Sequence, residues 1–91
     1  MTRFMVIEHI APGQLDAVYV RFHASGRQLP DGLVYLDSWL SDDGARCFQL
    51  METDDPALFD VWQAAWSDLV RFEVVALRDK PAKLTAPAVG A

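Results

Sequence analysis

The chain has 91 residues, the length of one domain, and its 52% apolar and 23% charged residues predict that it folds. Thirteen acidic against eight basic residues give a net charge of −5, and because no basic stripe opposes it, we expect no nucleic-acid partner. The single cysteine, Cys47, excludes an internal disulfide, and two histidines leave little for a metal site, so we expect no metal and no cofactor.

The first part of the chain predicts a strand, a helix and a second strand. Residues 3–10 hold a run of four apolar residues that is too short for a helix core, and the breaker APG follows at 11–13. A helix is predicted over 14–27, where the apolar residues at helical spacing are Leu15, Val18, Tyr19 and Phe22. After a loop that contains PDG, residues 33–40 predict a strand of aromatic and β-branched residues.

A tight hairpin is predicted next. Asp43 and Gly44 tolerate the positive φ angles of a two-residue turn, so the strand at 33–40 should pair with a returning strand at 45–53. The expected cross-strand pairs are Trp39 with Phe48 and Tyr35 with Glu52.

The strongest helical pattern in the chain follows the hairpin. A helix is predicted over 56–69 with Asp55 as its N-cap. Its apolar residues include Phe59, Trp62, Trp66 and Leu69, and we interpret the two tryptophans as core rather than as part of a cofactor site. Residues 70–77 predict the last strand, and 79–91 predict an Ala/Pro-rich tail outside the single domain of residues 1–78.

The element order β-α-β-β-α-β predicts an α+β, ferredoxin-like fold in which two helices cover one face of a four-stranded antiparallel sheet. The uncovered face of such a sheet is ordinarily polar. Here both faces carry apolar residues, and the first strand has Phe4, Val6 and Ile10 on one side with Met5 and Ile7 on the other. Because a large exposed apolar face is rare in a monomer, we expect a homodimer in which two sheets close into a dimeric α+β barrel.

Five segments carry a family resemblance: 5–8 (MVIE), 30–33 (PDGL), 38–39 (SW), 47–55 (CFQLMETDD) and 66–74 (WSDLVRFEV). In these segments the chain resembles a bacterial family of short proteins known as domain of unknown function 3303. The resemblance covers most of the chain and implies a dimeric α+β barrel. It implies no particular reaction, because that superfamily includes cofactor-free monooxygenases, haem-degrading enzymes, small isomerases and non-catalytic ligand-binding proteins.

Two glutamates are candidates for acid/base chemistry or for polar ligand contacts. Glu8 lies in an apolar strand, and if it faces the interior, desolvation raises its pKa and suits it to be a general base. The alternative is a strand-end carboxylate that pairs with an arginine or lies at the rim. Glu52, expected opposite Tyr35, could bind a polar ligand or pass on a proton, or else make a structural hydrogen bond just before Asp55.

Aromatic and polar residues of the two hairpin strands are candidates for a cavity wall. Tyr35 and Trp39, on one face of their strand, either form an aromatic wall or belong to ordinary core or dimer packing. Gln49 shares a strand face with Cys47, which we interpret as buried and unreactive because no base can be placed beside it. A shift of one residue exchanges the faces of a strand, so two sets remain candidates to face the cavity: Tyr35, Asp37 and Trp39, or Val34, Leu36 and Ser38.

Two hypotheses for the function result. The first is a small homodimeric protein that binds a small, partly apolar molecule through Glu8, Tyr35, Trp39, Gln49 and Glu52. The second is a cofactor-free monooxygenase or isomerase that uses Glu8 or Glu52 as its acid/base group. Haem is disfavoured, because related folds often bind it through a histidine on the second helix, and the helix at 56–69 has none. The apolar runs are far shorter than the roughly 20 residues of a membrane span, and no signal peptide begins the chain, so we expect a cytoplasmic protein without a membrane partner.

Overall fold

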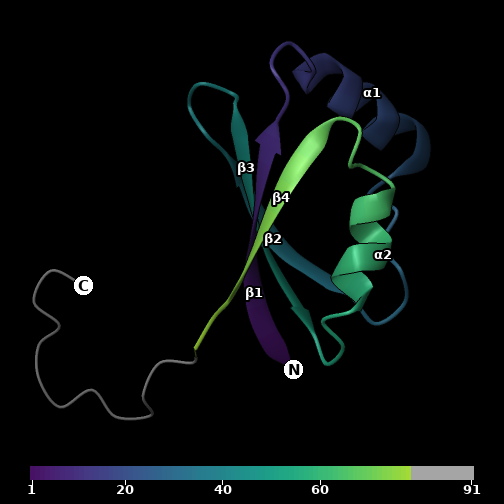
Figure 1. Cartoon of the computed structure of the whole chain (residues 1–91), viewed down its shortest axis with the longest axis vertical. Helices are drawn as coiled ribbons and strands as arrows, with labels where there is room; N and C mark the ends of the chain where they lie inside the picture. The colour runs from purple at the N-terminus through teal and green to yellow at the C-terminus, as the bar shows by residue number, and fades with distance from the viewer. Residues whose placement is uncertain (79–91) are drawn as a thin grey trace, which may run out of the picture.

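The computed structural model describes residues 1–78, and the tail predicted at 79–91 lies outside the described residues. The elements are β1 (Thr2–Ile10), α1 (Leu15–Ser25), β2 (Val34–Leu40), β3 (Arg46–Thr53), α2 (Leu58–Ala64) and β4 (Val70–Ala76). The strands form one antiparallel sheet in the order β2-β3-β1-β4, and both helices lie on one side of it (Figure 1). The predicted α+β, ferredoxin-like order of elements is confirmed.

The two helices are shorter than their periodic patterns predict. In α1 the helix ends at Ser25, because Gly26 adopts a positive φ of 67° and its N–H bonds back to the Phe22 carbonyl at 2.7 Å. Ahead of α2, the Asp55 carboxylate accepts a hydrogen bond from the N–H of Ala57 at 3.1 Å. The residues after Ala64 continue as turns with i to i+3 hydrogen bonds, and these turns connect α2 to β4.

The hairpin between β2 and β3 follows the predicted register only near its turn. Trp39 pairs with Phe48 as expected, and the turn is held by Asp43, whose carboxylate accepts from the Ala45 N–H at 2.9 Å. Further along, the register shifts by one residue between Tyr35 and Asp37, at a β-bulge. The predicted pairing of Tyr35 with Glu52 is therefore wrong, because Tyr35 pairs with Met51.

The bulge also separates two residues that we expected on one strand face. Tyr35 lies on the helix side of the sheet, opposite the buried Met51, whereas Trp39 lies on the other side, opposite the half-buried Phe48. An extra residue in one strand reverses the alternation of every side chain beyond it. The expected aromatic wall of Tyr35 and Trp39 therefore does not exist in the described chain.

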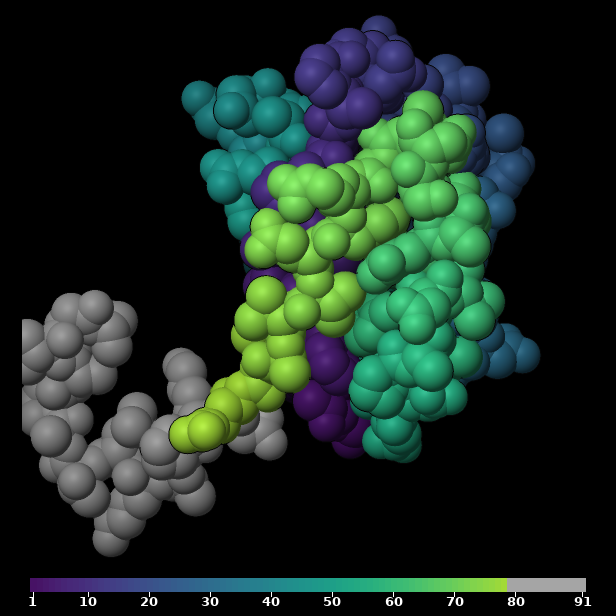
Figure 2. Space-filling view, in the orientation of Figure 1, coloured from purple at the N-terminus to yellow at the C-terminus, as the bar shows by residue number. Residues whose placement is uncertain are grey.

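The hydrophobic core lies between the sheet and the helices. Its buried members are Phe4, Val6, Leu33, Met51, Phe59, Trp62 and Trp66. Phe4 packs edge to face on Phe59 with 4.9 Å between the ring centroids, and Trp62 packs in the same way on Phe72 at 5.2 Å. Figure 2 shows the resulting close packing of α2 along β4. Both tryptophans of the second helical segment belong to this core, as the helical spacing predicts.

The second face of the sheet is apolar as well, and neither helix covers it (Figure 1). We define the open face by its apolar residues: Met5, Ile7, Trp39, Phe48, Leu50 and Val75. Trp39 is 50% exposed and Val75 44% exposed, and they lie on the opposite edge strands β2 and β4. Two polar contacts flank this patch: an ion pair in which Arg3 lies 3.7 Å from Glu52, and a hydrogen bond of 2.5 Å between His9 and Glu73. Among the described residues, no helix has the length and apolar character needed to cross a membrane.

Candidate ligand-binding cavity

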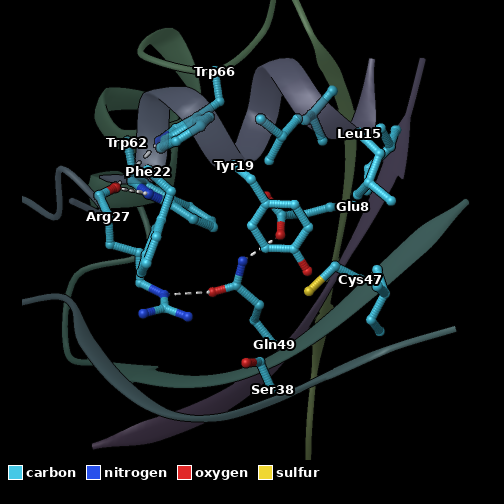
Figure 3. A pocket seen from close by; sticks show the side chains of 14 residues that line it. Glu8, Leu15, Tyr19, Phe22, Arg27, Ser38, Cys47, Gln49, Trp62 and Trp66 are labelled. Carbon is cyan, nitrogen blue, oxygen red and sulfur yellow. Dashed lines mark hydrogen bonds between the residues drawn. The ribbon is translucent and has the colours of Figure 1, made fainter. Parts of the chain in front are cut away.

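A cavity of about 200 Å³ lies between α1, the sheet and the segment that runs from Trp62 of α2 to Val70 of β4. Its apolar wall includes Tyr19 and Phe22 of α1 together with Trp62 and Trp66 (Figure 3). Its polar wall comes from the sheet and consists of Glu8, Ser38, Cys47 and Gln49. A mostly apolar pocket with a few convergent polar groups is the usual form of a small-molecule site.

Glu8 is the central polar group of this cavity. It points from β1 to the helix side because it follows the buried Phe4 and Val6 in the strand alternation. Its Oε1 accepts a hydrogen bond from the Gln49 Nε2. Burial raises the pKa of Glu8, and the hydrogen bonds from Gln49 and Cys47 together with the positive charge of Arg27 oppose that rise only in part.

Cys47 is a hydrogen-bond donor in this site rather than a nucleophile. Burial and the neighbouring carboxylate of Glu8 raise the pKa of the Cys47 thiol to about 12. A thiol with so high a pKa stays protonated at neutral pH, and the thiolate is the reactive form. The structure thus supports the interpretation of Cys47 as an unreactive cysteine.

Arg27 connects the polar wall to the aromatic core. Its Nε donates to the Gln49 Oε1 at 3.1 Å, and its guanidinium lies 3.6 Å from the ring centre of Tyr35. Its backbone carbonyl accepts the indole N–H groups of Trp62 at 2.9 Å and Trp66 at 3.2 Å. Figure 3 shows this continuous set of hydrogen bonds from the tryptophans through Arg27 and Gln49 to Glu8.

The structure brings three of the five predicted ligand-binding residues together. Glu8 and Gln49 line the cavity, and Tyr35 lies beside it, where its hydroxyl is 2.6 Å from the Ser38 Oγ. Trp39 and Glu52 lie on the other face of the sheet, outside this cavity. Neither of the two alternative strand faces lies wholly on the cavity side of the sheet. Because of the bulge, Tyr35 of one set and Ser38 of the other lie together on that side.

Arg27 is absent from the predicted site residues, and Ser38 belongs to only one of the two alternative strand faces. Arg27 lies at the end of a predicted helix and 22 residues from Gln49, so no local spacing links the two. Only the bulge places Ser38 on the same side of the sheet as Tyr35. Tyr19 and Phe22 were found as the apolar side of a helix, which is the feature that makes them a wall.

A pH dependence of stability follows from the raised pKa of Glu8. Because the native state holds this proton more tightly than the unfolded chain, stability is lost as the pH rises from the usual value of 4.5 through the folded pKa. We expect Glu8→Gln to remove this loss, so its Tm relative to wild type should rise over that interval. A shift of one in pKa corresponds to about 1.4 kcal/mol.

Thermal unfolding followed by circular dichroism between about pH 4 and pH 8 measures this effect. Glu52→Gln is the matched control, since Glu52 also lies on a sheet strand but on the open face beside Arg3. If the Tm curve of Glu8→Gln runs parallel to the wild-type curve, Glu8 does not hold its proton in the native state.

The fold and the cavity together define a small α+β protein of ferredoxin-like topology with a candidate small-molecule site between sheet and helices. Residues 2–82 match the model of the family described as Domain of unknown function (DUF3303), and the chain belongs to this family. The resemblance seen in the sequence segments is thereby confirmed. No curated protein matches the chain significantly. Among residues 1–78, no three His, Cys, Asp or Glu side chains are grouped so that they could hold a metal ion.

Proposed function

We propose that this protein is a homodimeric α+β barrel that binds a small, partly apolar molecule in the cavity beside Glu8. The observation that carries the proposal is the cavity itself, with an aromatic wall on the helix side and a compact polar group on the sheet side. Its volume of about 200 Å³ suits a molecule built on one ring, because an apolar cavity of about 150 Å³ holds benzene.

The apolar open face supports the homodimer. Half-buried and exposed apolar side chains continue across all four strands of this face, and a second copy of the chain would remove them from water. The flanking pair Arg3–Glu52 carries both signs of charge, which suits the contact of two identical faces.

A second candidate function is a cofactor-free enzyme of the monooxygenase or isomerase type. The observation in its favour is the raised pKa of Glu8 inside a cavity, since a carboxyl that titrates nearer neutral pH is a better general acid/base. Glu52, the other acid/base candidate, lies outside this cavity. In this reading Glu8→Gln abolishes turnover of an aromatic or carbonyl substrate but leaves the binding of an apolar ligand nearly unchanged.

The binding proposal can be tested by an NMR titration with toluene, which probes the apolar wall. The indole N–H signals of Trp62 and Trp66 report on the cavity, and the signal of Trp39 on the open face is an internal control. We expect toluene to shift the first two signals at concentrations that leave the third unchanged. Native mass spectrometry of the same sample reports the oligomeric state and any molecule retained from purification.

A cavity-filling variant on α1 makes the site assignment specific. Val18 lines the cavity, whereas Val20 on the same helix is 68% exposed. We expect Val18→Phe to weaken toluene binding about tenfold or more, because the new ring occupies the space, and Val20→Phe to bind as wild type. Equal affinities of the two variants and wild type would place the ligand elsewhere and refute the proposal.

A further inference from the structure

We infer that the cavity selects an uncharged, one-ring ligand that donates a hydrogen bond to Glu8, the chemistry of a phenol-type hydroxyl, and that Arg27 is the positioning residue behind this selectivity. The inference rests on the proposed function, since it assigns a ligand class to the same cavity. Three features of the cavity support it: the orientation of the Gln49 amide, the free acceptor position of the Glu8 carboxyl and the charge of the site.

The amide of Gln49 can be held in only one orientation. Arg27 is a donor without acceptor atoms, so the group it contacts at 3.1 Å must be the Gln49 carbonyl oxygen. The amide nitrogen is then directed at Glu8, to which it donates. The guanidinium in turn is fixed against the Tyr35 ring at 3.6 Å, and the Arg27 backbone is held by the two indoles. Arg27 therefore decides which end of Gln49 faces the carboxyl.

Glu8 is consequently surrounded by donors and offers an acceptor to the cavity. Gln49 donates to its carboxyl, and the protonated thiol of Cys47 is a second donor beside it. A carboxylate has about four acceptor positions, so these two donors leave room for a third on the side that lines the cavity. A ligand that brings a hydroxyl hydrogen fills this place, whereas an ether or a hydrocarbon of the same shape leaves it empty.

The charges and the aromatic walls of the cavity determine which net charge and shape the ligand should have. The ionised form of Glu8 and the guanidinium of Arg27 have opposite charges and interact within the same site, so an uncharged ligand leaves this pair balanced. A carboxylate ligand would meet the charge of Glu8, and an ammonium ligand would have to give up its hydration in a mostly apolar cavity. The rings of Tyr19, Phe22 and the two tryptophans favour a flat aromatic body.

The test compares probes of one shape in NMR titrations of the full chain: p-cresol, toluene, 4-methylbenzoate and 4-methylbenzylamine. In wild type we expect p-cresol to bind about tenfold more tightly than toluene, since a hydrogen bond to a charged acceptor contributes that much, and to exceed both charged probes. Toluene and p-cresol of equal affinity, or a tighter charged probe, would overturn the inference while leaving the binding proposal intact. Unchanged Trp62 and Trp66 signals with every probe would overturn the binding proposal itself.

Variants then assign the selectivity to residues through the ratio of the p-cresol and toluene affinities. Glu8→Gln should reduce this ratio several-fold, because a neutral amide is a weaker acceptor. Arg27→Met keeps an apolar stem against Tyr35 but removes the donor that orients Gln49, so it should reduce the ratio as well. Glu52→Gln, on the open face, should leave the ratio unchanged. A general loss of stability would weaken both probes together, so a wild-type ratio in Arg27→Met would refute its positioning role.

Discussion

Replacement of Trp62 by alanine is expected to lower the free energy of unfolding by about 3–5 kcal/mol, which is the usual cost of removing a large buried aromatic side chain. Trp62 is 1% exposed and is the largest fully buried side chain of the described residues. Its ring packs on Phe72 of β4, and its indole N–H donates to the Arg27 carbonyl. The substitution thus opens a void between α2 and the sheet and removes one of the two indole N–H groups that donate to the Arg27 carbonyl.

Urea unfolding followed by circular dichroism measures this loss, and two variants serve as controls. Val61→Ala changes the neighbouring residue, which is 60% exposed on the same helix, and should alter stability by no more than about 0.5 kcal/mol. Trp62→Phe keeps an aromatic ring and removes the indole N–H, while Trp66 still donates to the same carbonyl. The free energy of unfolding of Trp62→Phe should lie between those of Trp62→Ala and Val61→Ala. An alanine variant as stable as Val61→Ala would show that Trp62 does not anchor the core.

A single lysine on the open face is expected to convert the proposed homodimer into a monomer. Trp39→Lys and Val75→Lys each place a charge on an edge strand of this face, one on β2 and the other on β4. Both side chains are exposed in the single chain, so the substitutions should leave the fold of one copy intact. Within an interface, however, an unpaired charge costs several kcal/mol, and each 1.4 kcal/mol weakens the dimer about tenfold.

Native mass spectrometry and sedimentation at matched concentration separate the outcomes. Wild type should have about twice the chain mass of 10.2 kDa, and both lysine variants should have the chain mass. Val20→Lys and Val61→Lys are the controls, because they add the same charge to exposed apolar positions on the helix side. A wild-type chain that is monomeric at all concentrations would refute the homodimer, and so would lysine variants that remain dimeric.

The order of elements and the positions of the core residues follow from local patterns in the sequence. Helical spacing alone identifies Trp62 and Trp66 as core. The consecutive apolar residues of β1 predict that both faces of the sheet are apolar. The Asp43–Gly44 turn predicts the pairing of Trp39 with Phe48 correctly. Such features depend on the helical and strand periods and on turn chemistry, which residues within a few positions of one another determine.

The candidate site could be predicted only in part. Glu8 and Gln49 were expected to contact a ligand, and they do line one cavity, because each follows the alternation of a regular strand. Tyr35 and Trp39 were expected on one face, but the extra residue at the bulge separates them. No short-range sequence pattern predicts that bulge, because it depends on how β2 pairs with β3 along the whole length of the hairpin.

Local periodicity thus predicts which residues form strands, helices and core, because each element must place its apolar residues on the side that is buried. Local periodicity does not predict the hydrogen-bonded polar residues of the cavity. Arg27 meets Gln49 of β3 and the indoles of Trp62 and Trp66 only when the loop after α1 folds back between the sheet and the second helix. These contacts join segments more than 20 residues apart, and their partners are chosen by distance in space rather than by spacing along the chain. The tertiary structure alone therefore decides that Glu8 is buried among donors, on which its raised pKa and the proposed selectivity for ligands depend.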